Sequence, residues 1–311
     1  MSCTSELNDK NSALRKWFYE NQNTEQLSRY NKYLQSNLPI ILPIGPEIPP
    51  AGFKFIGTVV DYLIRYAANG NKLDFQNTIA MNAVRSPSSN NTIKGYFLIG
   101  KWHLCGEHPA SQAAIYSATA LTILDGYYRS GSLPFDFAYR KISDKMIRNC
   151  DIADINEQLK ENLEGFIEKH GGDYYYNDIA NIIRRFRENL LNACGQLYGA
   201  KLVNGDNEFN NSIFVGGADF DCIIHHKDKK VLTEIKTSKN NTTIKNLRQL
   251  LTYALLYDPE LDFFEIDSIG FYHSRSGSFR YIDIDNTILN VFPGFKSVTD
   301  ARKSFINAIS K

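Results

Sequence analysis

The sequence predicts an α/β or α+β fold, with a small central sheet and a large helical N-terminal part. Before about residue 200, apolar residues recur mostly at the spacing of amphipathic helices. After it, two pairs of short strands flank one helix, an order typical of a domain in which helices pack on a sheet. We therefore expect a mainly helical region at 1–199 and an α/β core at 200–311.

The N-terminal part alternates helical spacing with segments that break it. Five prolines in residues 38–52 predict an extended or looped stretch. A second loop is predicted at 83–95, where Ser, Asn and Pro gather. The helices predicted from apolar spacing span residues 11–35, 53–70, 108–129, 151–169 and 174–198.

The C-terminal part has the clearest strand signals. Strands are predicted near 217–225 and 231–236, on either side of the turn HKDKK. A helix is predicted at 243–257. Two more strands, near 267–274 and 279–284, flank the sequence SRSGS.

Composition narrows the class of protein. The hydrophobic fraction of 43% and the charged fraction of 22% are ordinary for a globular protein. Five cysteines without a CxxC pair indicate reduced thiols, so we expect a cytoplasmic location. The N-terminus shows no apolar signal segment, and no run has the roughly 18 apolar residues of a membrane span, so no membrane partner is expected. Because the net charge is only +1, any surface that binds nucleic acid must be local.

One stretch places ionisable residues where a sheet normally holds Val or Ile. It reads GGADFDCIIHHKDKKVLTEIKTSK and contains Asp219, Asp221, Glu234 and Lys236. Residues at i and i+2 share a face of a strand, so a hairpin can bring the carboxylates together with a lysine beside them. Oxygen ligands suit Mg²⁺ or Mn²⁺, and a nearby ammonium can act on a water molecule, which together describe phosphodiester hydrolysis. The alternative is a surface hairpin with a salt bridge between Glu234 and Lys236.

The order of these residues resembles the PD-(D/E)XK nuclease superfamily, and its RecB-like branch in particular. DCII, which begins at Asp221, matches the strand with the first carboxylate. Glu234 and Lys236 match the (D/E)xK element, and Gln249 and Tyr253 match the QxxxY signature of a following helix. The resemblance implies a restriction-endonuclease-like core.

An upstream helix also resembles that branch, whose pattern is Gly-Thr-x-x-His-x-x-Leu. Gly57 and Thr58 match it and Leu63 lies one residue before its Leu position, but Asp61 stands where the branch has His. The resemblance implies that the helix at about 53–70 is the first helix of the nuclease core. Asp61 would supply an additional carboxylate to the metal, or else it is an acid on the surface of the helix.

The resemblance also assigns roles within the site. Asp221 and Glu234 would bind Mg²⁺ or Mn²⁺ with the main-chain carbonyl of Ile235, and Lys236 would hold the attacking water. Gln249 and Tyr253 would face the site and contact substrate or steady the catalytic strand. GGAD at 216–219 leaves Asp219 as a rival metal ligand, but we favour Asp221 because it lies nearer the turn that joins the two strands.

The implied partner is nucleic acid, with DNA favoured over RNA. Residues 227–248 contain seven Lys or Arg against two acids, which fits a rim that binds the phosphate backbone at Lys239, Lys245 and Arg248. A solubilising face is the alternative.

The resemblance predicts a metal-dependent nuclease that acts in repair, recombination or phage defence. It would act alone or with protein partners in a multi-subunit system. The alternative function is a non-catalytic nucleic-acid-binding or scaffold protein with the same fold. The spacing of the cysteines predicts no iron–sulfur cluster. His103, Cys105 and His108 are zinc-type ligands without an evident fourth partner.

Overall fold

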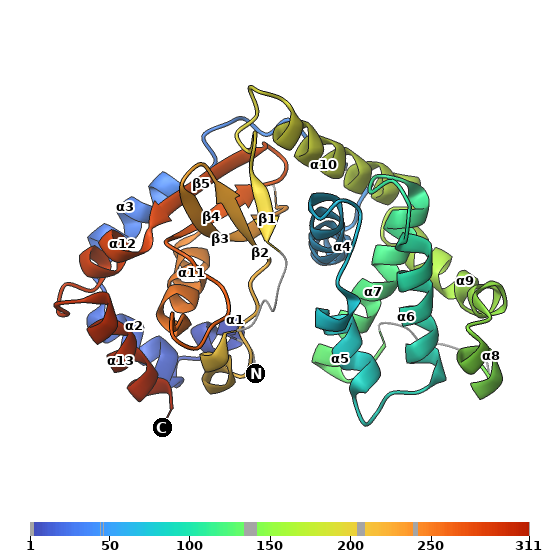
Figure 1. The fold of residues 1–311 in the computed structure, drawn as a ribbon, viewed down its shortest axis with the longest axis horizontal. Helices are drawn as coiled ribbons and strands as arrows, with labels where there is room; N and C mark the ends of the chain where they lie inside the picture. The colour runs from blue at the N-terminus through green and yellow to red at the C-terminus, as the bar shows by residue number, and fades with distance from the viewer. Residues whose placement is uncertain are drawn as a thin grey trace. The chain divides into compact units, whose positions relative to one another are not determined.

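The chain forms two compact units (Figure 1). The computed structural model describes residues 3–43, 45, 47–133, 142–203, 209–238 and 242–310. One unit, here called the sheet unit, comprises Met1–Ile40 and Asn189–Lys311. The other, the helical unit, comprises Ile41–Glu188.

The sheet unit contains a five-stranded mixed sheet in the order β1-β2-β3-β4-β5. Strands β3 and β4 are parallel, and the other neighbouring pairs are antiparallel. The fold is therefore mixed α/β with a small sheet, as the sequence predicts. The strands are β1 (Lys201–Val203), β2 (Cys222–His226), β3 (Lys229–Lys236), β4 (Ser268–His273) and β5 (Ser278–Asp283).

A helix connects the two parallel strands, because parallel neighbours cannot be joined by a tight turn. This helix, α11 (Ile244–Leu256), packs against the sheet face that presents Leu232, Ile269 and Phe271. Other helices of the unit complete the core on that face. They are α1 (Cys3–Asn8), α2 (Ala13–Asn21), α3 (Thr24–Leu34), the 3-10 helix η2 (Asn210–Val215), α12 (Ile284–Val291) and α13 (Val298–Ile309).

The division into units differs from the predicted boundary near residue 200. The first 40 residues belong with the sheet because their apolar side chains pack on the C-terminal helices. The ring of Trp17 lies 4.9 Å from that of Phe292 and 5.0 Å from that of Phe305, measured between centroids. The predicted helix at 11–35 is two helices, since Asn23 caps α3 by accepting a hydrogen bond from the Gln26 amide.

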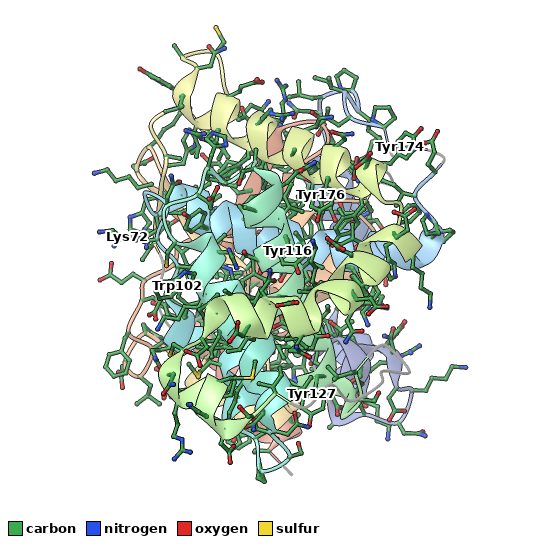
Figure 2. All side chains as sticks on the ribbon, turned by 90° about the vertical axis from the view of Figure 1, so that its right-hand side faces the viewer. Lys72, Trp102, Tyr116, Tyr127, Tyr174 and Tyr176 are labelled. Carbon is green, nitrogen blue, oxygen red and sulfur yellow. The ribbon has the colours of Figure 1, made fainter. Side chains whose placement is uncertain are left out.

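The helical unit is built from α-helices and one 3-10 turn in the residues described. They are α4 (Pro50–Ala68), η1 (Phe75–Asn77), α5 (Ile79–Arg85), α6 (Asn91–Leu104), α7 (Gln112–Ser130), α8 (Asp144–Asn149), α9 (Ile152–Lys169) and α10 (Asp173–Leu191), whose last turn belongs to the sheet unit. Figure 2 shows Trp102 of α6 and Tyr174 of α10 at the surface, where they are 63% and 54% exposed.

Two predictions from the sequence differ from the structure in the helical unit and directly after it. The predicted loop at 83–95 contains the start of α6, because Asn90 accepts hydrogen bonds from the amides of Thr92 and Ile93 and begins the helix. The predicted helix at 174–198 ends at Leu191. The helix at 53–70, expected to be the first helix of the nuclease core, is α4 and belongs to the helical unit.

A buried acid lies inside the helical unit. The Tyr62 hydroxyl donates a 2.6 Å hydrogen bond to Asp125, which is 6% exposed. Burial raises the pKa of Asp125 from 3.8 to about 7, and the hydrogen bond from Tyr62 opposes that rise. The pKa of Asp125 is higher in the folded state than in the unfolded state. Its contribution to stability is therefore fully present below about pH 4 and is lost as the pH rises through 7.

None of the described helices is long and apolar enough to span a membrane.

Candidate active site

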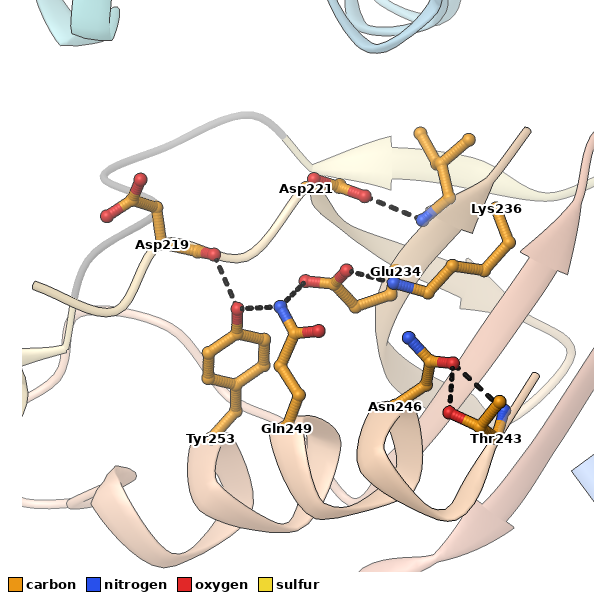
Figure 3. Close-up of polar contacts among 9 residues, drawn as sticks. Asp219, Asp221, Glu234, Lys236, Thr243, Asn246, Gln249 and Tyr253 are labelled. Carbon is orange, nitrogen blue, oxygen red and sulfur yellow. Dashed lines mark hydrogen bonds and ion pairs between the residues drawn. The ribbon is translucent and has the colours of Figure 1, made fainter. Parts of the chain in front are cut away.

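The candidate site lies where β3 extends beyond its neighbour β2. The last residue pair of that ladder is Cys222 with Thr233, so β3 continues past β2 from Glu234 to Lys236. The chain before β2 bends at Asp221, whose carboxylate takes the next position of the ladder. The Ile235 amide donates a 2.6 Å hydrogen bond to Asp221 Oδ2 (Figure 3).

The same geometry orients the main-chain carbonyl of Ile235. Within a strand, the N–H and C=O of one residue point to the same side. The amide of Ile235 points towards Asp221, so its carbonyl points to the side of β3 on which Asp221 lies. The carbonyl of Lys236 points the other way, towards β4, where it accepts a 3.0 Å hydrogen bond from the Ser274 amide.

Glu234 and Lys236 lie on one face of β3 and form a partly buried ion pair. Lys236 Nζ lies 2.8 Å from Glu234 Oε2, and the two side chains are 19% and 7% exposed, respectively. The ammonium also lies 5.5 Å from the centre of the Phe271 ring. An exposed salt bridge on a surface hairpin, the alternative considered above, does not describe a pair with this little exposure.

Neighbouring charges keep Lys236 protonated. Burial lowers the pKa of Lys236, but the carboxylates of Glu234 and Asp221 and the hydrogen bond to Glu234 raise it more, so that the net shift is upwards. The lysine is therefore a proton donor or a fixed positive charge in this arrangement. A cation between the two carboxylates would weaken their hold on the ammonium proton.

Helix α11 contributes two polar side chains to the site from consecutive turns. Gln249 Nε2 lies 3.4 Å from Glu234 Oε1 and 2.7 Å from the Tyr253 hydroxyl. The Tyr253 hydroxyl donates a 2.9 Å hydrogen bond to the carbonyl of Asp219. Burial raises the pKa of Tyr253 well above its usual value, so the phenol stays protonated as this donor. Gln249 thus orients Glu234, while Tyr253 holds the segment before β2.

The two aspartates of the segment before β2 differ in direction. Asp219 is held through its main-chain carbonyl, and its carboxylate points away from Glu234 (Figure 3). Asp221 instead turns its carboxylate towards β3. This geometry supports Asp221 rather than Asp219 as the partner of Glu234.

A divalent ion would find two carboxylates and a main-chain carbonyl at this strand end, from Asp221, Glu234 and Ile235. This all-oxygen donor set is the kind that Mg²⁺ and Mn²⁺ prefer. The part of the chain that the structure describes contains no group of three or more His, Cys, Asp or Glu side chains placed to hold a metal. Because two carboxylates and one carbonyl fill only part of the coordination shell of such an ion, water or phosphate oxygens would complete it.

Asp61, the further metal ligand that the resemblance implies, and the three zinc-type residues lie in the helical unit. Asp61 is on α4 and forms an ion pair with Arg65 one turn further along the helix. His103, Cys105 and His108 do not gather into a group of metal ligands among the described residues. His108 contacts Arg187 instead.

The predicted backbone-binding residues fall in three different situations. Lys239 lies outside the described residues. Lys245 is exposed in the first turn of α11. Arg248 is partly buried, and its guanidinium lies over the ring of Tyr19.

Some residues around the site gave no signal in the sequence. Cys3 is 2% exposed, and its amide donates a 3.0 Å hydrogen bond to the carbonyl of Gly217. Burial raises the pKa of the Cys3 thiol to about 12, against the effect of a hydrogen bond with Thr252, and the charge of Glu234 adds to the rise. The thiol is therefore protonated at neutral pH. Only tertiary contacts bring it to the site, and local spacing does not encode them.

The turn between β4 and β5 braces the same strand end. Arg275 is 2% exposed, and its Nε donates a 2.5 Å hydrogen bond to the carbonyl of Thr237. The Ser274 amide holds the carbonyl of Lys236. These contacts fix the main chain at Lys236 and directly after it.

Comparison of the chain with known protein families, with curated proteins and with solved structures found no significant match.

Proposed function

We propose that the sheet unit hydrolyses phosphodiester bonds in nucleic acid, with DNA as the favoured substrate and Mg²⁺ or Mn²⁺ as the cofactor. The observation that supports this function is the convergence of Asp221, Glu234 and Lys236 at one strand end, with Gln249 hydrogen-bonded to the buried carboxylate. These residues are the ones on which the resemblance to the RecB-like branch of the PD-(D/E)XK superfamily rests.

Each side chain has a separate task in this proposal. Asp221 and Glu234 provide negative charge that attracts a cation and the water around it. The bound ion would act as a Lewis acid on the phosphate oxygens. Lys236 Nζ donates one hydrogen bond to Glu234, and its other N–H donors orient a water molecule or stabilise charge that develops on the phosphate.

Gln249 and Tyr253 act through other groups. The Gln249 amide fixes the rotamer of Glu234 and leaves the second carboxylate oxygen to Lys236. Tyr253 positions the main chain of Asp219, two residues before Asp221. Both are positioning residues, since these contacts are to protein groups around the two metal-binding carboxylates of the proposal.

The test is a cleavage assay of purified protein on linear, circular and single-stranded DNA, with Mg²⁺, Mn²⁺, Ca²⁺ or EDTA. Cleavage is expected with Mg²⁺ or Mn²⁺ and none in EDTA. Lys236→Met should lose cleavage, whereas Lys230→Met, at the other end of the same strand, should keep it. Binding without cleavage in every metal would favour the non-catalytic alternative, and cleavage in excess chelator would exclude the proposed chemistry.

A further inference from the structure

A cluster of cations and one aromatic ring lies beside the candidate site, on α2 and α11. We call it the Tyr19 cluster, and it comprises Arg15, Tyr19, Gln22 and Arg248. The guanidinium carbon of Arg248 lies 4.6 Å from the centre of the Tyr19 ring, and that of Arg15 lies 5.3 Å from it. Tyr19 itself is 53% exposed. Of these residues the sequence connects only Arg248 with nucleic acid, because Arg15 and Tyr19 are more than 200 residues away from it in the chain.

The cluster holds its two guanidinium groups in place. Arg248 Nε donates a 3.1 Å hydrogen bond to Gln22 Oε1, and its Nη1 lies 3.3 Å from the Tyr19 hydroxyl. Arg15 Nη1 donates a 2.9 Å hydrogen bond to the carbonyl of Asn8. These contacts fix each side chain through neutral acceptors and an aromatic face. A preorganised guanidinium loses less conformational entropy when it binds an anion.

The positive charge of the cluster is not neutralised by carboxylates. Within the described ranges, neither Arg15 nor Arg248 forms an ion pair with an Asp or Glu. Arg248 and, to a lesser degree, Arg15 lower the pKa of the Tyr19 hydroxyl, because their positive charges favour its ionised form. Each guanidinium group can bind the oxygens of a phosphate group through two parallel hydrogen bonds.

The position of Arg248 connects the cluster to the site. Arg248 directly precedes Gln249 on α11, and Gln249 lies 3.4 Å from Glu234. Consecutive residues of a helix have Cα atoms about 3.8 Å apart and point about 100° apart around the axis. The cluster therefore occupies the helix face next to the one that bears Gln249.

We propose that the Tyr19 cluster binds the phosphodiester backbone of the substrate strand next to the nucleotide that is cleaved. This inference rests on the proposed function for its substrate class. Arg15 and Arg248 contact phosphate oxygens, and Tyr19 holds the two guanidinium groups close to its ring. An acidic protein segment would also meet the positive charge, so the test includes it.

The test measures binding separately from cleavage, so that one can fail without the other. A fluorescein-labelled single-stranded DNA oligonucleotide is titrated with protein in EDTA at several salt concentrations. Arg15→Ala and Arg248→Ala should each weaken binding and reduce the magnitude of the slope of log K against log salt by about 0.7, which is the loss of one phosphate contact on a single strand. Lys16→Ala removes the same charge from an exposed position on α2 and should leave the slope unchanged.

A third variant probes the ring without changing the charge. Tyr19→Ala should weaken binding while both arginines remain, and because Tyr19 is half exposed the fold should tolerate the change. Equal salt slopes for the wild type, Arg248→Ala and Lys16→Ala would overturn the inference even if the protein cleaves DNA. Tighter binding of polyglutamate than of the oligonucleotide would overturn it in favour of an acidic protein partner.

Discussion

Replacing Lys236 with Met tests the ion pair at the centre of the candidate site. The substitution keeps most of the apolar stem but leaves Glu234, whose side chain is 7% exposed, without its ammonium partner. A hydrogen bond between charged groups contributes about 1.5–3 kcal/mol, and removal of one partner of a fully buried pair costs about 3–5 kcal/mol. Because Lys236 keeps 19% exposure, we expect a loss of about 2–3 kcal/mol in the free energy of unfolding.

A double-mutant cycle separates this pair from its surroundings. Urea unfolding of the wild type, Glu234→Gln, Lys236→Met and the double variant should give a coupling energy of about 1–3 kcal/mol. The double variant should be less destabilised than the sum of the single variants, because it leaves no charge unpaired. Lys230→Met is the matched control, since Lys230 lies on the same strand as Lys236 but forms an exposed pair with Glu265. It should change neither stability nor cleavage much.

Lys236→Met should also abolish DNA cleavage while the protein stays folded. A coupling energy below about 0.5 kcal/mol, together with normal cleavage, would refute the reasoning, because the pair would then behave like an ordinary exposed salt bridge.

Other substitutions test the neighbouring contacts. Gln249→Ala should lower the cleavage rate by about 10–100-fold, because Glu234 loses the amide that orients it, while urea unfolding shows a loss of only about 1 kcal/mol. Asp221→Asn should abolish Mg²⁺ binding in calorimetry and Asp219→Asn should retain it, and the reverse result would exchange their roles. Between about pH 4 and pH 7 the wild type should lose up to about 4 kcal/mol of unfolding free energy relative to Asp125→Asn. Parallel curves for these two proteins would show that Asp125 titrates as an exposed acid.

The sequence predicts those parts of the site that depend on local spacing. Glu234 and Lys236 share a strand face because they are two residues apart, and Gln249 and Tyr253 share a helix face because they are four apart. The structure has both pairs in these arrangements, with a contact between Gln249 and Glu234 that joins them. Strands β3 to β5 and α11 also lie close to their predicted ranges, whereas β2 begins at Cys222, five residues later than predicted, so that Asp219 and Asp221 precede it.

The rest depends on contacts between residues far apart in the chain. Trp17 packs on Phe292 and Phe305, and no periodicity within residues 11–35 shows which part of the protein its apolar face will meet. Asn90 illustrates a different limit. Asn and Ser favour both loops and helix N-caps. The sequence at 83–95 therefore predicts a loop, although α6 begins within it.

The site borders the apolar centre of a sheet face. Leu232, Ile269 and Phe271 on that face are fully buried beneath the helices, yet Glu234 stands beside them on β3. Burial of a charge is costly unless it is paired, and an apolar pair of similar volume would often be as stable or more stable. Stability alone therefore does not account for Glu234 and Lys236 at these positions. Under the proposed function, a reaction that needs fixed negative charge next to an ammonium group would account for them, and these two strand residues are the main support for that proposal.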